Sequence, residues 1–384
     1  FRARATTPRG GMGLFVQGPF RGQLSARGEP LTITDNTGRL VCSNYFAGSP
    51  SLVQQYLRIT ELMYNPSSWG GGADAQQYEY VELRNISANV TLDLTGVYFA
   101  NSIQFAFTGA AITQLAPGAR VLVVQNQAAF AARYGAGLPV AGQYTGNLAN
   151  SGERIVLRDG GNEEILDFTY QNNWYPVTDG AGFSLVIVND NAAPEQWNAA
   201  ANWRPGGIEG GSPGQTDSPA PPPAPVIITE ILSRTDAPLV DAVELFNPAA
   251  TNADIGGWFL SDDLADPKKY RIPDGTVMGP GEYLVFDERQ FNANVNSPAS
   301  FAFSAKGDQA YLFSGDARTN LTGYVFGREF GAAENGVSFG SYTNSLGREF
   351  FVAQRSRTLP GPNSGPLVGP VVISEIMYHP PDLP

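Results

Sequence analysis

Pairs of glutamates recur along this chain at places where two carboxylates could meet. Glu61 and Glu82 lie in two successive strand-like runs, and Glu230 and Glu244 take the same places in a second pair of runs. Glu375 follows in a further copy of the first run. If successive runs form neighbouring strands, two such carboxylates can share a proton, bind a cation or divide the roles of acid and base.

Three roles for these glutamates follow, and we expect a structural one. Each carboxylate would accept hydrogen bonds from backbone donors near a sheet edge. The glutamates recur in every copy, and a module repeated for length has no need of a repeated active site. A cation site and a hydrolase that uses Glu61 and Glu82 are the alternatives. The hydrolase requires a concave pocket holding both groups and at least one perturbed pKa.

Three aspartates in one expected loop, Asp262, Asp263 and Asp266, are the candidate metal ligands. Calcium takes about six to eight oxygen ligands. The spacing here matches neither an EF-hand nor a nonapeptide calcium repeat. We therefore expect these to be solvated turn acids, with calcium as the one cofactor left open and no other cofactor expected.

Five aromatic residues could present flat rings to a sugar. They crowd one part of the chain and are Trp69, Trp174, Tyr175, Trp197 and Trp203. The other interpretation, which we favour, is packing in the core and at sheet edges, since tryptophan buries a large area and needs few polar partners.

The sequence offers little for nucleophilic or metal catalysis. Its one cysteine is Cys42 and its one histidine is His379, which excludes internal disulfides and Cys-rich zinc sites. We expect Cys42 to be a small buried residue in a strand and His379 to belong to a turn. With no well-placed base to activate a serine, we expect no catalytic residues and no enzyme.

Composition points to strands and turns. The 384 residues carry a net charge of -12, which repels phosphate backbones, so a nucleic-acid partner is not expected. No run approaches the roughly 20 apolar residues of a membrane span. Charged residues are scarce, and 44 glycines and 29 prolines favour short strands joined by turns.

The expected elements are mostly short strands. Apolar runs such as 121–124, 155–157, 185–188 and 283–286 have Gly, Pro, Asn or Asp close by. Residues 127–134 have a helical composition, enough for about two turns. Many short strands separated by turn signals predict β-sandwiches, whose two sheets would bury these runs.

An internal repeat of domain size organises the chain. The glutamate of the first run recurs at 61, 230 and 375, and further landmarks follow in the same order. We expect the C-terminal half of a domain at 1–52, a whole domain at 53–217, a Pro-rich linker at 218–225, a second whole domain at 226–366 and the first strand of another domain at 367–384. Pro-rich joints are semi-rigid spacers.

The repeated segments resemble the bacterial lamin-tail domain, an immunoglobulin-like β-sandwich. The resemblance covers residues 57–215 and 226–366, and in the first copy it is carried by Ile59-Thr60-Glu61-Leu62-Met63-Tyr64-Asn65-Pro66, Tyr80-Val81-Glu82-Leu83-Arg84-Asn85, Leu92-Asp93-Leu94-Thr95-Gly96 and Leu115-Ala116-Pro117-Gly118. It implies an all-β fold of tandem immunoglobulin-like sandwiches joined by short Pro-rich linkers. Bacterial members resemble modules of large secreted or cell-surface proteins, sometimes beside hydrolases, nucleases or kinase-like domains.

We therefore expect a non-enzymatic structural or adhesive protein that is extracellular or on the cell surface. Its string of modules would form a filament or surface layer, with partners that are copies of itself or neighbouring domains of a longer chain. The alternative is a carbohydrate- or calcium-dependent binding module attached to a larger secreted enzyme, with a surface glycan as partner. A lamin-like nuclear role is disfavoured because no coiled-coil heptads occur.

The two end fragments allow two assemblies. A strand donated from one chain to the next would satisfy exposed sheet edges. A longer continuous chain would supply the missing halves directly. The fragments together fall short of one whole copy, which favours the longer chain.

Overall fold

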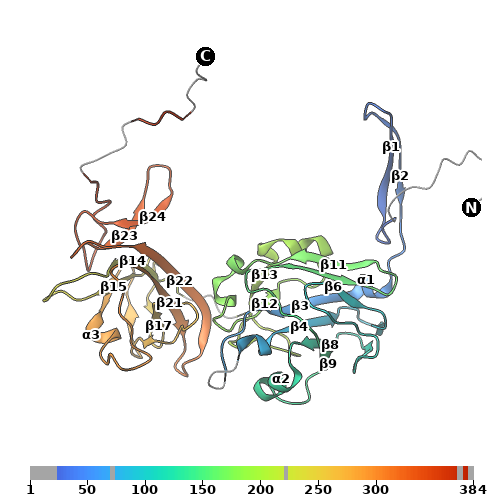
Figure 1. The fold of residues 1–384 in the computed structure, drawn as a ribbon, viewed down its shortest axis with the longest axis horizontal. Helices are drawn as coiled ribbons and strands as arrows, with labels where there is room; N and C mark the ends of the chain where they lie inside the picture. Colours follow the sequence, from blue (N-terminus) through green and yellow to red (C-terminus); the bar gives the residue numbers. More distant parts are fainter. Residues whose placement is uncertain (1–23, 70–73, 220–223, 370–374, 379–384) are drawn as a thin grey trace, which may run out of the picture. The chain divides into compact units, whose positions relative to one another are not determined.

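The structure, a computed structural model, describes residues 24–69, 74–219, 224–369 and 375–378. These residues belong to two compact units, 1–55 and 56–384. Strands dominate both units (Figure 1), as the composition predicts. In the described part of the chain, no helix is long and apolar enough to cross a membrane.

In the first unit, the strands among residues 24–55 form one hairpin. Strands β1 (Glu29–Thr34) and β2 (Leu40–Phe46) pair in antiparallel fashion around a turn in which Asp35 accepts the backbone N–H of Thr37. Cys42 lies in β2, as predicted, but the expectation that it is buried is wrong, because its side chain is exposed. The reason is that, in the described part of this unit, the two-stranded hairpin has no second sheet to cover it.

The second unit begins with a sandwich that we call the first module, containing β3 to β13. Its larger sheet has the order β13-β12-β3-β4-β8-β9. These strands are β3 (Leu57–Met63), β4 (Tyr80–Asn85), β8 (Arg120–Val124), β9 (Val140–Gln143), β12 (Leu185–Ile187) and β13 (Trp203–Pro205). The facing sheet, in the order β11-β10-β6, consists of β6 (Tyr98–Asn101), β10 (Arg154–Arg158) and β11 (Glu164–Thr169).

Short elements complete the first module. Strands β5 (Leu92–Asp93) and β7 (Gln114–Leu115) form a two-stranded ribbon. The helices are α1 (Leu52–Tyr56), which begins in the first unit, α2 (Gln127–Tyr134), and the 3₁₀ turns η2 (Ala75–Tyr78), η3 (Asn172–Trp174), η4 (Pro176–Thr178), η5 (Pro194–Asn198) and η6 (Ala200–Asn202).

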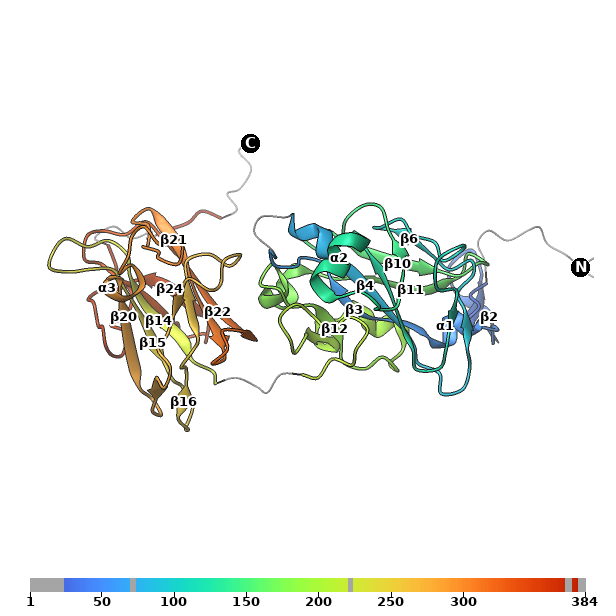
Figure 2. The same ribbon diagram turned by 90° about the horizontal axis from the view of Figure 1, so that it is seen from below.

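Helix α2 confirms the one helical prediction. The side chain of Asn126 caps its first turn by accepting the backbone N–H groups of Ala128 and Ala129. Phe130 is buried against Met63 and Tyr80, so the helix covers the larger sheet near β4 (Figure 2). This cover leaves the middle of β3 and β4 fully buried.

The second module contains β14 to β24 and repeats the plan. Its larger sheet has the order β20-β15-β14-β23-β24, formed by β14 (Ile227–Leu232), β15 (Ala242–Phe246), β20 (Tyr283–Asp287), β23 (Phe339–Thr343) and β24 (Glu349–Ala353). Its facing sheet, β18-β17-β21-β22, consists of β17 (Phe259–Ser261), β18 (Tyr270–Arg271), β21 (Gly307–Gly315) and β22 (Leu321–Gly331). The remaining elements are β16 (Ala253–Asp254), β19 (Val277–Met278) and α3 (Glu288–Phe291).

The two modules use equivalent strands at the centre of the larger sheet. Strand β12 pairs with β3 through Val186 and Glu61, and β23 pairs with β14 through Gly340 and Glu230. One continuous core between the sheets of the second module holds Val243, Ile255, Trp258, Leu312 and Phe330. The chain is therefore all-β, with two tandem immunoglobulin-like sandwiches, as expected.

The predicted first strand of a further domain falls mostly outside the described residues. Residues 370–374 and 379–384, including His379, are not described, and neither are residues 220–223 of the expected linker. Residues 375–378 are described, have no strand conformation and are exposed.

Candidate functional site

The two glutamates of the first module face each other across β3 and β4. Glu61 pairs with Glu82 in the antiparallel register, immediately after a bulge that follows Ile59. Both side chains are only 2% exposed. The sequence prediction that the two carboxylates meet on neighbouring strands is therefore confirmed by the strand register.

The carboxylate of Glu61 accepts hydrogen bonds from three parts of the module. Tyr80 and Ser184 donate their hydroxyls to Oε1 at 2.7 and 2.6 Å. Ser212 donates its backbone N–H to Oε1 at 2.9 Å and its hydroxyl to Oε2 at 3.1 Å. Ser212 begins the stretch 212–217, which we call the closing segment. Glu61 thus joins the module's first strand to this late segment.

Glu82 also binds the closing segment, and we call the bonds from the two glutamates to this segment the attachment. Its Oε1 accepts the Thr60 hydroxyl at 2.7 Å and the Arg120 Nε–H at 3.0 Å. Its Oε2 accepts the backbone N–H of Gly214, in the closing segment, at 2.7 Å. All four carboxylate oxygens of the pair therefore accept at least one hydrogen bond from the module itself.

The second module repeats this arrangement with its own closing segment, residues 358–363. Glu230 and Glu244 pair across β14 and β15, again beside a bulge. Glu230 accepts the Ser338 hydroxyl at 2.6 Å, the backbone N–H of Thr358 at 3.0 Å and the Thr358 hydroxyl. Glu244 accepts the Thr229 hydroxyl and the backbone N–H of Gly361, both at 2.7 Å.

Burial changes the acidity of these groups. Loss of solvation raises the pKa of Glu61, and raises that of Glu82 to about 7 with a further contribution from the charge of Glu61. Burial also raises the pKa of Glu244 to about 7. The hydrogen bonds oppose these increases without cancelling them, so the pKa of Glu82 lies close to neutral pH.

A third buried acid precedes each second glutamate by three residues, and the sequence analysis missed it. Glu79 is fully buried and accepts the Tyr144 hydroxyl at 2.9 Å and the Leu148 N–H at 2.8 Å. Burial raises its pKa to about 8. Asp241 takes the same place before β15, where burial raises its pKa to about 6. The spacing Glu79–Glu82 and Asp241–Glu244 could have revealed this position.

A small cleft of about 180 Å³ lies beside the pair in the first module. Its wall includes Glu61, Glu82 and the ion pairs Arg84–Asp190, with the atoms 2.7 Å apart, and Arg204–Asp217. A pocket that holds both glutamates and a raised pKa are thus both present, as the hydrolase alternative requires. What the arrangement offers chemically is a buried proton-binding pair whose oxygens are already occupied by internal donors.

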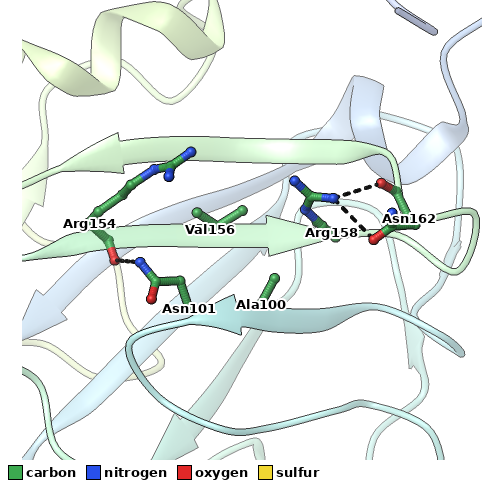
Figure 3. A pocket seen from close by; sticks show the side chains of 6 residues that line it. All are labelled: Ala100, Asn101, Arg154, Val156, Arg158 and Asn162. Carbon is green, nitrogen blue, oxygen red and sulfur yellow. Dashed lines mark hydrogen bonds between the residues drawn. The ribbon is translucent and has the colours of Figure 1, made fainter. Parts of the chain in front are cut away.

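A second, more open hollow of about 420 Å³ lies on the outer face of the facing sheet (Figure 3). Arg154 and Arg158 of β10 flank Val156, and Arg158 donates to the carbonyl and side chain of Asn162. Asn101 donates to the Arg154 carbonyl at 3.1 Å. Arg154 is ion-paired with Asp167, and Arg158 with Glu164 at 3.2 Å.

The three candidate metal ligands do not converge. Asp262 is ion-paired with Lys269, Asp263 accepts the Ala265 N–H at 2.8 Å, and Asp266 is exposed. Among the described residues, no group of three or more His, Cys, Asp or Glu side chains is placed to hold a metal ion. Solvated turn acids are the expectation for this loop, and calcium stays the open alternative.

The five aromatic residues differ in exposure, and Trp174 and Tyr175 are half-buried. Trp197 and Trp203 are buried, and their indole N–H groups donate to the carbonyls of Ile59 and Trp197 at 3.0 and 2.8 Å. These two rings pack in the core, as favoured. Trp69 is 43% exposed and meets Tyr78 edge-on. Glu375, the last repeated acid, is exposed, and its structural role remains a prediction.

Comparison with known proteins adds one finding. The family model described as Lamin Tail Domain matches residues 51–172 and 219–328, together more than half of the chain. The matched ranges contain both carboxylate pairs. Searches against curated proteins and against solved structures find no match.

Proposed function

Because the chain belongs to the lamin tail domain family, a non-catalytic immunoglobulin-like family, we propose that it is a non-enzymatic structural or adhesive protein. Its tandem sandwiches would act as spacers or assembly units in a filament or surface layer. The partners are copies of the chain or neighbouring domains of a longer one. Lamin tail domains occur in extracellular proteins, which supports a place outside the cell or on its surface.

The observation that carries this proposal is that both carboxylate pairs bind the backbone of their own module. In both modules, each glutamate of the pair accepts a backbone N–H from the closing segment. A group that satisfies buried backbone donors stabilises the fold, since an unsatisfied buried donor costs about 1–3 kcal/mol. Repetition of the same contacts in two modules favours a shared architectural role.

The hydrolase alternative has the pocket and the raised pKa but lacks free carboxylate oxygens. An acid or base must reach the proton of a substrate at hydrogen-bonding distance. Glu61 and Glu82 are 2% exposed and already bonded to Tyr80, Ser184, Ser212, Thr60, Arg120 and Gly214. A structural role accounts for each of these contacts.

Electron microscopy of the native material, combined with intact mass, tests the proposal. Filaments or a sheet are the expected result, and a mass above 41.0 kDa per chain would indicate a longer continuous chain. Surface labelling of intact cells should reach the protein. Discrete 41.0 kDa monomers confined to the cell interior would contradict both the assembly and the location.

Binding of a glycan is the second candidate, and it is supported by one exposed ring. Trp69 lies against Tyr78, whose face is covered by the Arg133 guanidinium at 4.9 Å. A glycan array compared between the wild-type chain and Trp69→Ala tests this function. A binding signal that disappears in the variant would support it, with the calcium-dependent form identified by adding a chelator.

A further inference from the structure

The facing sheet of the second module carries apolar side chains on both surfaces. Trp258, Leu260 and Leu312 point into the core. Because side chains alternate along a strand, Phe259 and Phe313 lie on the opposite, outer surface. They nevertheless are almost fully buried, together with Leu321. We call these three residues the outer patch, and something other than their own core must cover them.

The cover comes from the first module. Val177, Ala181 and Phe183, which lie between β11 and β12, form one buried cluster with the outer patch. The Phe183 ring packs against Gly323, where an added Cβ would lie 3.6 Å from the ring edge. Phe183 is fully buried. An aromatic ring buried in this way removes a large apolar area from water.

A polar contact borders the cluster. Glu209 of the first module pairs with Lys268 of the second, with Nζ 2.9 and 2.8 Å from the two carboxylate oxygens. The same carboxylate accepts the backbone N–H of Leu321 at 3.0 Å. An apolar centre with a hydrogen-bonded charged rim is the usual anatomy of a specific interface.

The equivalent surface of the first module has a different chemistry. The strand registers put Arg158 opposite Tyr98, and Phe313 opposite Phe259 in the second module. Arg158 thus takes the place of Phe313, within the open hollow of Figure 3. A guanidinium that is ion-paired and partly solvated cannot offer the apolar contact that Phe183 uses. The outer patch is therefore a property of the second module and not of the fold.

We propose that the outer patch is a docking surface for residues 177–183 of the preceding module, and that this contact couples the stabilities of the two modules. Both modules lie in one compact unit of the structure. The inference goes beyond a structural role, because a Pro-rich joint alone would leave the modules energetically independent. It does not depend on cellular location or on assembly.

Carbodiimide cross-linking of the intact chain tests the contact directly. The reagent joins a lysine amine to a carboxylate that it touches, with loss of one water. The chain has three lysines, and Lys269 pairs with Asp262 inside the second module, which provides an internal positive control. In the monomeric fraction we expect Lys268–Glu209 and Lys269–Asp262 peptides. Formation of the control link without the Lys268–Glu209 link would overturn the proposal.

Hydrogen exchange measures the coupling. The Leu321 amide, which donates to Glu209, reports opening of the contact. We expect Phe183→Ala, or Phe313→Ala on the other side, to accelerate its exchange by about tenfold or more, while core strands β4 and β15 stay protected. Val188→Ala, at an exposed position near β12, is the matched control and should change nothing. Unchanged Leu321 exchange in both phenylalanine variants would contradict the coupling.

Discussion

The two modules hold the same buried carboxylate pair in different surroundings. In the first module, Arg84 and Arg120 face each other on β4 and β8, and each is ion-paired. In the second, Phe246 and Tyr283 occupy the corresponding register positions and stack with ring centroids 4.5 Å apart. The contacts to the closing segment are nevertheless repeated. The comparison indicates that this attachment needs the two glutamates, while the adjoining sheet surface can be ionic or aromatic.

Removal of the first glutamate in either module should have the largest effect. Glu61→Ala leaves the buried donors of Tyr80, Ser184 and Ser212 without an acceptor. At about 1–3 kcal/mol for each, we expect more than about 3 kcal/mol of destabilisation, measured by denaturant unfolding. Glu230→Ala should act likewise on the second module.

Exposed Glu195 gives the matched control, since Glu195→Ala should change stability by less than about 0.5 kcal/mol. A loss below about 1 kcal/mol in Glu61→Ala would show that the pair does not hold the closing segment.

The second largest effect should be a difference between the two modules in how their stability depends on pH. An acid whose pKa is raised on folding stabilises the folded state while protonated, so this stability is lost as pH rises through the folded pKa. In the first module, stability should be lost up to the folded pKa values, which are about 7 for Glu82 and about 8 for Glu79. In the second module, the folded pKa values are about 6 for Asp241 and about 7 for Glu244, so the loss of stability should end at lower pH.

Unfolding free energies measured between pH 5 and pH 9 should therefore decline in both modules, by a few kcal/mol. The decline of the first should continue to higher pH. Glu79→Gln, which mimics the protonated acid, should flatten the first module's curve above pH 7. A curve that rises over this range, or is unaffected by the substitution, would refute the proposed protonation.

Loss of the arginine beside Glu82 should have a smaller, pH-dependent effect. Arg120 favours the charged form of Glu82, so Arg120→Leu should raise the pKa of Glu82 further. We expect a destabilisation of about 1–2 kcal/mol at pH 8 and less at pH 5, where Glu82 is protonated. Tyr283→Leu, at the equivalent position, should show equal effects at both pH values.

Replacing the arginine pair beside the carboxylates of the first module by the aromatic pair of the second should have the smallest effect on stability. The double variant Arg84→Phe and Arg120→Tyr gives the first module the aromatic pair of the second. Stacked rings contribute about 0.5–1.5 kcal/mol, comparable to partly exposed ion pairs, so calorimetry should find a net change within about 1 kcal/mol. A collapse of the first module would mean that its arginines are required for the attachment.

Local pattern and repetition were enough to predict much of the fold. The alternation of short apolar runs predicted the sandwiches, and the composition of residues 127–134 predicted helix α2. Recurrence of the first run placed Glu61 and Glu230 on equivalent strands, so that their pairing with Glu82 and Glu244 followed from neighbouring strands alone.

What the sequence could not predict depends on distant contacts. Ser212 meets Glu61 across 151 residues, and no local pattern marks that contact. In the sequence Glu79 is an ordinary acid beside a strand, because the residues that bind it, Tyr144 and Leu148, lie 65 and 69 positions later in the chain. Cys42 was expected to be buried because its strand is apolar, yet burial also needs a second layer.

The attachment of each closing segment to the first strand has a mechanical consequence. Force applied along the chain would enter the first module near β3 and leave it near Ser212 and Gly214, which are bonded to the same carboxylate pair. The force would then be shared by a few buried hydrogen bonds to the two carboxylates, and the interior of the sandwich would not carry it. A module built in this way resists stretching at its junctions, where a tethered chain is pulled.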